Sequence, residues 1–174
     1  MRDQQLARFD QAVLPHLGAA YNLARWLTRD DHDADDVVQE ACLRAYQFLD
    51  GFRGGDGRAW LLRIVRNTCY TWLERNRPRE PPAAFDEDKH GGARPGPGPE
   101  APLVQGEDRE LLRRALAELP QEYREAIVLR ELEGLSYKEI AAVTGAPLGT
   151  VMSRLARARE RLHERLARPT PGGP

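Results

Sequence analysis

Apolar residues recur every three or four positions along most of this 174-residue chain, which is the spacing of one face of an α-helix. The pattern stops between residues 77 and 106, where Pro and Gly are too dense for a helix or a strand to persist. Neither flank alternates apolar and polar residues as a strand would. The pattern therefore predicts an all-α protein with two small helical domains joined by a flexible Pro/Gly-rich linker.

The breaks in the pattern also give domain boundaries. We place a three-helix domain at residues 1–76, the linker at 77–106, a second helical domain at 107–168 and a disordered tail at 169–174. Each domain is long enough for a modest core of its own.

The first two helices of the N-terminal domain are predicted from different features of the sequence. One runs from about Gln4 to Thr28, with Pro15 as the expected site of a bend, and the next begins near Asp33. The buried stripe of the second helix is predicted to consist of Val38, Ala41, Cys42, Ala45 and Leu49. Its outer side carries Asp36, Gln39, Glu40 and Gln47.

The third helix, from about Arg58 to Arg75, has two distinct faces. The apolar face carries Leu61, Val65, Thr68 and Trp72. The other face carries Arg63, Arg66, Asn67 and Tyr70. Cations, an amide and an aromatic ring suit the phosphates and unpaired bases of a nucleic acid, and a solvated helix face is the alternative. Trp60 and Trp72 are expected to pack in the core.

The C-terminal domain begins with two helices whose ends are marked by helix breakers. The first spans about Glu107–Leu119, and the second opens at Pro120 and closes at Gly134.

A helix, a tight turn and another helix follow. The sequence S-Y-K-E from Ser136 to Glu139 is a capping box, Gly145 supplies the turn, and Pro147 begins the last helix. The buried face of the last helix is predicted to consist of Leu148, Val151, Leu155, Ala158, Leu162 and Leu166.

The opposite face of the last helix is polar and cationic. It carries Thr150, Ser153, Arg154, Arg157 and Arg161. The helix after a tight turn is the element that enters the major groove, so these residues are the expected contacts to duplex DNA. A solvated arginine-rich surface is the alternative.

The net charge of −1 conceals a sorted distribution of charges. Residues 30–40 hold six acidic residues and no Lys or Arg, whereas residues 53–79 hold seven arginines and two acidic residues. Residues 140–168 hold six arginines and two glutamates. Two basic surfaces suit phosphates, and one acidic surface suits a basic protein partner.

The acidic segment has a structural and a binding interpretation. Asp33 and Asp35 lie where carboxylates favour the positive end of a helix, whereas Asp36, Gln39 and Glu40 are candidates for binding a partner. Catalysis or metal binding is disfavoured because neither a nucleophile nor a glycine-rich phosphate loop accompanies the segment.

The rest of the composition excludes further classes of protein. The four histidines lack metal-ligand spacing, so neither a metal nor a cofactor is expected. Cys42 and Cys69 are expected to be buried, reduced thiols. No apolar run approaches the roughly 20 residues that span a bilayer, and the N-terminus lacks a signal-peptide segment. A cytoplasmic protein without membrane insertion is expected.

Three stretches of sequence resemble the extracytoplasmic-function (ECF) group of sigma-70 RNA polymerase sigma factors. DADDVVQEACLRAY is similar to region 2.2, which in the family grips the clamp-helix coiled coil of the polymerase. FRGGDGRAWLLRIVRNTCYTWL is similar to regions 2.3 and 2.4, which open and capture the −10 element. Residues 118–162 are similar to region 4, which binds the −35 element and the polymerase flap.

The resemblance implies roles for particular residues. It implies that Asp36, Gln39 and Glu40 contact core polymerase. It further implies that Asn67 helps to hold a flipped −10 base, with Arg63 and Arg66 nearby. In region 4, the residues implied to face the −35 duplex are Ser153, Arg154 and Arg157. Many family members have an arginine where this chain has Met152, so one DNA contact is missing or replaced.

The resemblance implies a transcription initiation factor that is not an enzyme. Its implied partners are core RNA polymerase, promoter DNA and an anti-sigma factor. The alternative is a conventional helix-turn-helix regulator whose N-terminal domain serves oligomerisation or ligand binding. A regulator that reads only duplex DNA has no evident use for an acidic helix followed by an Arg/Asn/aromatic helix, so we favour the sigma factor.

Overall fold

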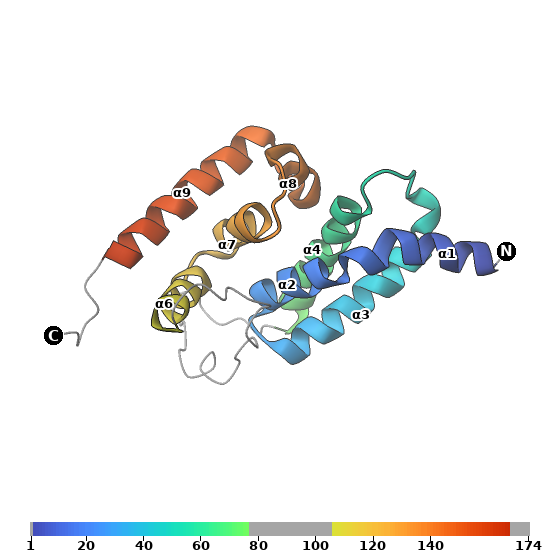
Figure 1. Cartoon of the computed structure of the whole chain (residues 1–174), viewed down its shortest axis with the longest axis horizontal. Helices are drawn as coiled ribbons and strands as arrows, with labels where there is room; N and C mark the ends of the chain where they lie inside the picture. Colours follow the sequence, from blue (N-terminus) through green and yellow to red (C-terminus); the bar gives the residue numbers. More distant parts are fainter. Residues whose placement is uncertain (1, 77–105, 168–174) are drawn as a thin grey trace. The chain divides into compact units, whose positions relative to one another are not determined.

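The computed structural model describes residues 2–76 and 106–167, and every regular element in these two ranges is helical (Figure 1). The chain divides into two compact units, one built mainly from the N-terminal helices and one mainly from the C-terminal helices. The predicted all-α class with two helical domains is therefore confirmed. The predicted linker, apart from Gly106, and the predicted tail lie outside the described residues.

The N-terminal unit begins with two helices where the sequence predicted one. α1 (Arg2–Val13) and α2 (Leu17–Thr28) are separated by a 3-10 turn, η1 (Leu14–His16). This turn contains Pro15, which has no backbone N–H to donate and whose ring disfavours a continuous helix. The bend predicted near Pro15 is therefore present as a break.

The remaining elements of this unit are α3 (Asp31–Gln47), η2 (Leu49–Gly51) and α4 (Gly57–Asn76). α2, α3 and α4 pack on one another, and α1 lies against α4 and α3. The largest buried side chains of the unit include Leu23, Leu27, Leu49, Leu61 and Leu62.

Most of the predicted core of this unit is buried, with three exceptions. The buried members of the two predicted stripes are Val38, Ala41, Ala45, Leu49, Leu61, Val65 and Thr68. Cys42 is only half-buried, and so are Trp60 and Trp72. Trp60 packs against Phe52, with ring centroids 4.8 Å apart, but this contact leaves it only half-buried. The prediction that these three side chains are buried was wrong because they lie at the edges of their helix faces.

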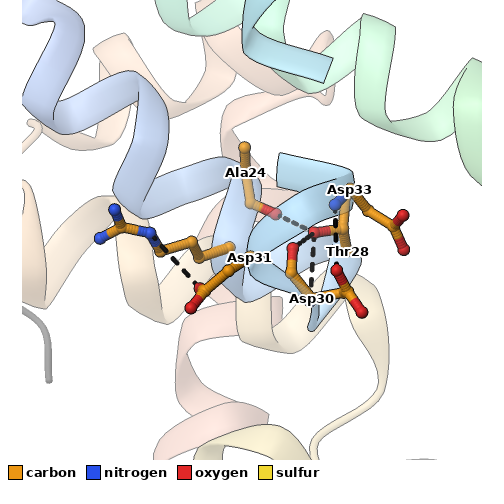
Figure 2. A network of polar contacts seen from close by, with 6 residues as sticks. Ala24, Thr28, Asp30, Asp31 and Asp33 are labelled. Carbon is orange, nitrogen blue, oxygen red and sulfur yellow. Dashed lines mark hydrogen bonds and ion pairs between the residues drawn. The ribbon is translucent and has the colours of Figure 1, made fainter. Parts of the chain in front are cut away.

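The turn from α2 to α3 determines where α3 begins (Figure 2). Thr28 Oγ1 donates to the Ala24 carbonyl at 2.8 Å and accepts from the Asp30 amide at 3.4 Å. Asp30 Oδ1 in turn accepts the Asp33 amide at 3.0 Å, which makes Asp30 the N-cap. The helix therefore begins at Asp31, two residues before the position predicted from the sequence.

The C-terminal unit contains α6 (Gly106–Ala117), α7 (Gln121–Ile127), η3 (Val128–Leu132), α8 (Tyr137–Thr144) and α9 (Leu148–Ala167). The predicted capping box is confirmed, because the Ser136 amide donates to Glu139 Oε1 at 2.9 Å and the Glu139 amide donates to Ser136 Oγ at 3.1 Å. Gly145 has a φ of 76°, a conformation that favours glycine and turns the chain from α8 into α9.

A buried arginine joins α6 to α7. The Arg124 side chain is fully buried, and its Nη1 donates to the carbonyls of Leu119 at 2.9 Å and Ala117 at 3.1 Å. These carbonyls lie at the end of α6 and just after it, where the helix itself offers no donors. Arg124 therefore fixes the end of α6 relative to the start of α7.

The apolar face of α9 is buried only in its middle. Val151, Leu155 and Ala158 are buried, and Leu162 is half-buried. Leu148 and Leu166, by contrast, are 42% and 48% exposed. α9 has 20 residues and is longer than the helices that pack on it, so its end leucines lie beyond the covered section. The prediction that the stripe is buried over its whole length was wrong at both ends.

Candidate nucleic-acid interface

One surface groove of the C-terminal unit gathers most of the predicted duplex-binding residues. Its volume is about 640 Å³, and it is lined by Glu122, Tyr123, Pro147, Gly149, Thr150, Ser153, Arg154 and Arg157. Four of the five predicted residues are in this set. The fifth, Arg161, lies one helical turn after Arg157 and is exposed.

The arginines of this groove contact side chains of α7. Arg154 Nη2 lies 3.5 Å from Glu122 Oε2, and Arg157 Nη1 donates to the Tyr123 hydroxyl at 3.5 Å. The guanidinium of Arg161 lies 5.1 Å from the centroid of the Tyr123 ring. The hydrogen bond that Arg157 donates to the Tyr123 hydroxyl raises the pKa of Arg157. The groove combines a fixed cationic edge with one carboxylate.

The hydroxyl of Ser153 is already engaged within α9. Ser153 Oγ donates its proton to the Gly149 carbonyl at 3.0 Å. The oxygen keeps its acceptor capacity, so it suits a donor such as the amino group of cytosine or adenine. This geometry fits a helix that reads base edges in a major groove.

The predicted face of α4 forms a connected group in the N-terminal unit. The Arg66 guanidinium lies 3.8 Å from the centroid of the Tyr70 ring, and its Nη1 donates to Asn67 Oδ1 at 3.3 Å. Arg63 and Asn67 are exposed, whereas Arg66 and Tyr70 are half-buried. Because Oδ1 of Asn67 is engaged, its amino group is the part suited to donating to a base edge.

The acidic face of α3 is more heterogeneous than the sequence predicted. Asp36 and Gln39 are exposed, but Glu40 is half-buried and its Oε1 accepts from Arg44 Nη2 at 3.1 Å. Burial and the neighbouring carboxylates of Asp30 and Asp36 raise the pKa of Asp33. Asp36 and Gln39 therefore offer the most accessible polar groups of the three predicted residues.

An apolar groove adjoins this acidic face. It is lined by Leu6, Phe9, Leu17, Tyr21, Val38, Gln39, Cys42, Leu43 and Tyr46. Gln39 belongs both to the groove and to the predicted binding surface, and Leu43 is 66% exposed. Periodicity on one helix did not reveal this groove, because its walls come from α1, α2 and α3.

Residues 2–76 and 106–167 contain no group of three or more His, Cys, Asp or Glu side chains placed to hold a metal ion. Cys42 and Cys69 form no disulfide, and burial raises the pKa of Cys42. No helix in the described parts of the chain combines the length and apolar character needed to cross a bilayer.

Comparisons with known proteins agree in both units. The family described as "Sigma-70 region 2" matches residues 12–79, and "Sigma-70, region 4" matches residues 109–162. The "ECF RNA polymerase sigma-E factor" of Escherichia coli (strain K12) is 40% identical over 141 residues, which cover 77% of this chain and 74% of that protein.

Two solved structures are also similar. The sigma factor RpoE in complex with the anti-sigma factor NepR from Bartonella quintana has a TM-score of 0.69 and 31% identity over 91% of this chain and 96% of that one. CnrH in complex with the cytosolic domain of CnrY has a TM-score of 0.62 and 30% identity over 91% of this chain and 86% of that one. On these matches, the chain belongs to the ECF group of the sigma-70 family.

Proposed function

We propose that this chain binds core RNA polymerase and directs it to promoters, reading the −10 element with its N-terminal unit and the −35 element with its C-terminal unit. The observation that carries the proposal is that the matched regions 2 and 4 each carry a different surface of arginine, polar and aromatic side chains. One is the α4 face and the other is the α9 groove. Bond formation belongs to the polymerase, so the chain itself is not an enzyme, and it acts in the cytoplasm.

The α9 groove is proposed to read the −35 duplex. Arg157 is the best candidate for a base contact because it is exposed and held at the groove. Arginine recognises guanine through two parallel hydrogen bonds in the major groove. Arg154, Ser153 and Thr150 extend the contact along the groove, and Arg161 lies one helical turn beyond Arg157.

The α4 face is proposed to capture bases of the opened −10 element. Asn67 would donate to the edge of an unpaired base, and Arg63 would contact the backbone phosphates. Tyr70 offers a ring for stacking, with Arg66 over one of its faces. Such a surface favours single-stranded over duplex DNA because stacking needs bases that have left the helix.

The α3 surface of Asp36, Gln39 and Glu40 is proposed to bind the clamp-helix coiled coil of core polymerase, with region 4 binding the flap. Its acidic character complements a basic partner. The two solved relatives are recorded with NepR and CnrY, and by analogy we also propose an anti-sigma partner for this chain. We keep residues 1–76 and 107–168 as the proposed extents of the two domains and residues 77–106 as the proposed linker.

A pull-down on purified core polymerase tests the proposal. The double reversal Asp36→Lys with Glu40→Lys should abolish association, because like charges across an interface cost several kcal/mol. Glu40→Lys also removes the ion pair with Arg44 and puts two cations four residues apart, and each of these two effects costs the helix only about 0.2–0.5 kcal/mol. Circular dichroism of the same sample should therefore show a folded protein.

A matched control carries the same change in charge on another part of the unit. Asp10→Lys with Asp50→Lys replaces two exposed carboxylates outside the proposed surface, and this variant should still bind core polymerase. The alternative of a conventional regulator predicts instead that the free protein binds duplex DNA tightly and specifically in gel shifts at physiological salt. Normal binding of core polymerase by the folded double reversal would remove α3 from the interface.

A further inference from the structure

Tyr123 lies at the centre of the cationic edge of the α9 groove, although nothing in the sequence pattern singled it out. It belongs to α7, which packs against α9. Its hydroxyl accepts from Arg157 Nη1 at 3.5 Å, and its ring lies 5.1 Å below the guanidinium of Arg161. One half-exposed aromatic side chain therefore contacts two of the five residues proposed to face the −35 duplex.

The spacing of the two arginines explains why a single ring can hold both. Arg157 and Arg161 are four residues apart on α9, so their side chains leave the same helix face one turn apart. Tyrosine offers two different contacts, since its oxygen accepts a hydrogen bond and its π face attracts a cation. Each arginine uses a different part of the same residue.

The position of Tyr123 is itself well fixed. The next residue, Arg124, is fully buried and donates to the carbonyls of Ala117 and Leu119. The amide of Tyr123 donates to the Pro120 carbonyl at 3.0 Å, in the first turn of α7. The ring is therefore attached to a rigid segment, which is what a group needs in order to orient others.

Exposed arginines lose much rotamer freedom when they bind, and this loss weakens the complex. A ring that already restricts Arg157 and Arg161 lowers that loss. We propose that Tyr123 is a positioning residue for −35 recognition: its hydroxyl orients Arg157 toward one base pair and its ring orients Arg161 toward the backbone. The proposal rests on the function proposed above for the α9 groove.

Two substitutions separate the parts of this role. Tyr123→Phe removes the hydroxyl that Arg157 contacts but leaves the ring beneath Arg161. Tyr123→Leu removes both contacts. Glu131→Gln is the matched control, because it removes the negative charge that Glu131 places 3.0 Å from Arg159, another α9 arginine that is outside the proposed site.

The experiment uses holoenzyme reconstituted from the full chain and purified core polymerase. Promoter occupancy is titrated on a promoter found by start-site mapping and on every single-base variant of its −35 element. Arg157→Ala first identifies the base pair that Arg157 reads. Tyr123→Phe should then weaken binding to the original promoter about 2- to 5-fold, the size expected for the loss of one exposed hydrogen bond.

Three features of the result are expected. The loss in Tyr123→Phe falls at the base pair read by Arg157, and it disappears when Arg157→Ala is already present. Tyr123→Leu further weakens promoter binding, by the same factor on every −35 variant. Glu131→Gln leaves the profile of the −35 variants unchanged.

Other results would overturn the inference. If Arg157→Ala changes the profile but neither Tyr123 variant does, Tyr123 has no positioning role and the proposed −35 site stands. If Tyr123→Phe lowers binding equally on all variants together with the melting temperature, Tyr123 is only a packing residue. If Arg157→Ala itself has no effect on any variant, the proposed −35 assignment fails and this inference fails with it.

Discussion

Replacing Gly57 by alanine is expected to destabilise the N-terminal unit strongly. Gly57 is the first residue of α4 and is buried against the end of α1. A Cβ at this position would lie 2.5 Å from the carbonyl oxygen of Ala12 and 3.2 Å from its carbonyl carbon and Cα. All three are backbone atoms, so no side chain can rotate away, and the two helices must separate.

The size of the effect follows from this clash. Real Cβ contacts are essentially never shorter than 3.0 Å, so α1 and α4 must move apart by at least about half an ångström. Overpacking of this kind typically costs about 1–3 kcal/mol. In a domain of this size each kcal/mol lowers the melting temperature by about 4–8 °C. The melting temperature of Gly57→Ala should therefore be lower than that of the unmodified protein by several degrees to about 20 °C.

The chain offers a convenient probe of this unit alone. All three tryptophans, Trp26, Trp60 and Trp72, lie within residues 2–76. Tryptophan emission during urea unfolding of the full chain therefore reports on the N-terminal unit. Gly18→Ala is the control, because Gly18 lies in α2 with no atom within 4 Å of the added Cβ. It should be neutral or more stable by up to about 1 kcal/mol.

A different outcome would refute the reasoning. An unfolding midpoint of Gly57→Ala equal to or above that of the unmodified protein would mean that the close approach of α1 and α4 does not constrain the unit. A similar loss in Gly18→Ala would mean that alanine is harmful for a reason unrelated to the contact with Ala12.

Two further predictions concern ionisation. Hydrogen bonds from Arg113, opposed by partial burial and aided by Arg114, lower the pKa of Glu110 from 4.5 to about 2. Because the folded pKa is the lower one, the stabilisation is present above about pH 4.5 and is lost as the pH falls toward 2. Glu110→Gln should flatten the acid unfolding curve in this range, by less than about 1 kcal/mol because the pair is partly exposed to solvent. An unchanged curve would contradict the pairing. Burial raises the pKa of Cys42, so its thiol should react with iodoacetamide more slowly than the thiol of glutathione does at pH 7.5. Mass spectrometry of the labelled protein measures this rate, and labelling faster than that of glutathione would contradict the burial of Cys42.

Local signals predicted much of the fold. The capping box at Ser136, the turn at Gly145 and the break at Pro15 each depend on the backbone needs of a few consecutive residues. Helix periodicity also placed most of the core correctly, because burial follows the face of a helix. These features required no knowledge of how the helices pack.

The features that the sequence did not reveal depend on which helices become neighbours. Glu122 and Tyr123 contribute to the α9 groove from another helix, and their spacing on α7 carries no sign of this. Arg124 looks like a surface residue but is fully buried because it caps α6. Leu148 was predicted to be buried because the pattern shows a face but not how much of it is covered.

Run-off transcription with purified core polymerase on genomic fragments, followed by mapping of the start sites, tests the central claim most directly. We predict transcripts that require this chain and that start downstream of two shared elements. Asn67→Ala should reduce them, and a template already melted over the −10 element should restore them. Arg157→Ala should reduce them on both templates. Transcripts that are the same with and without the chain, or that share no upstream elements, would contradict the assignment.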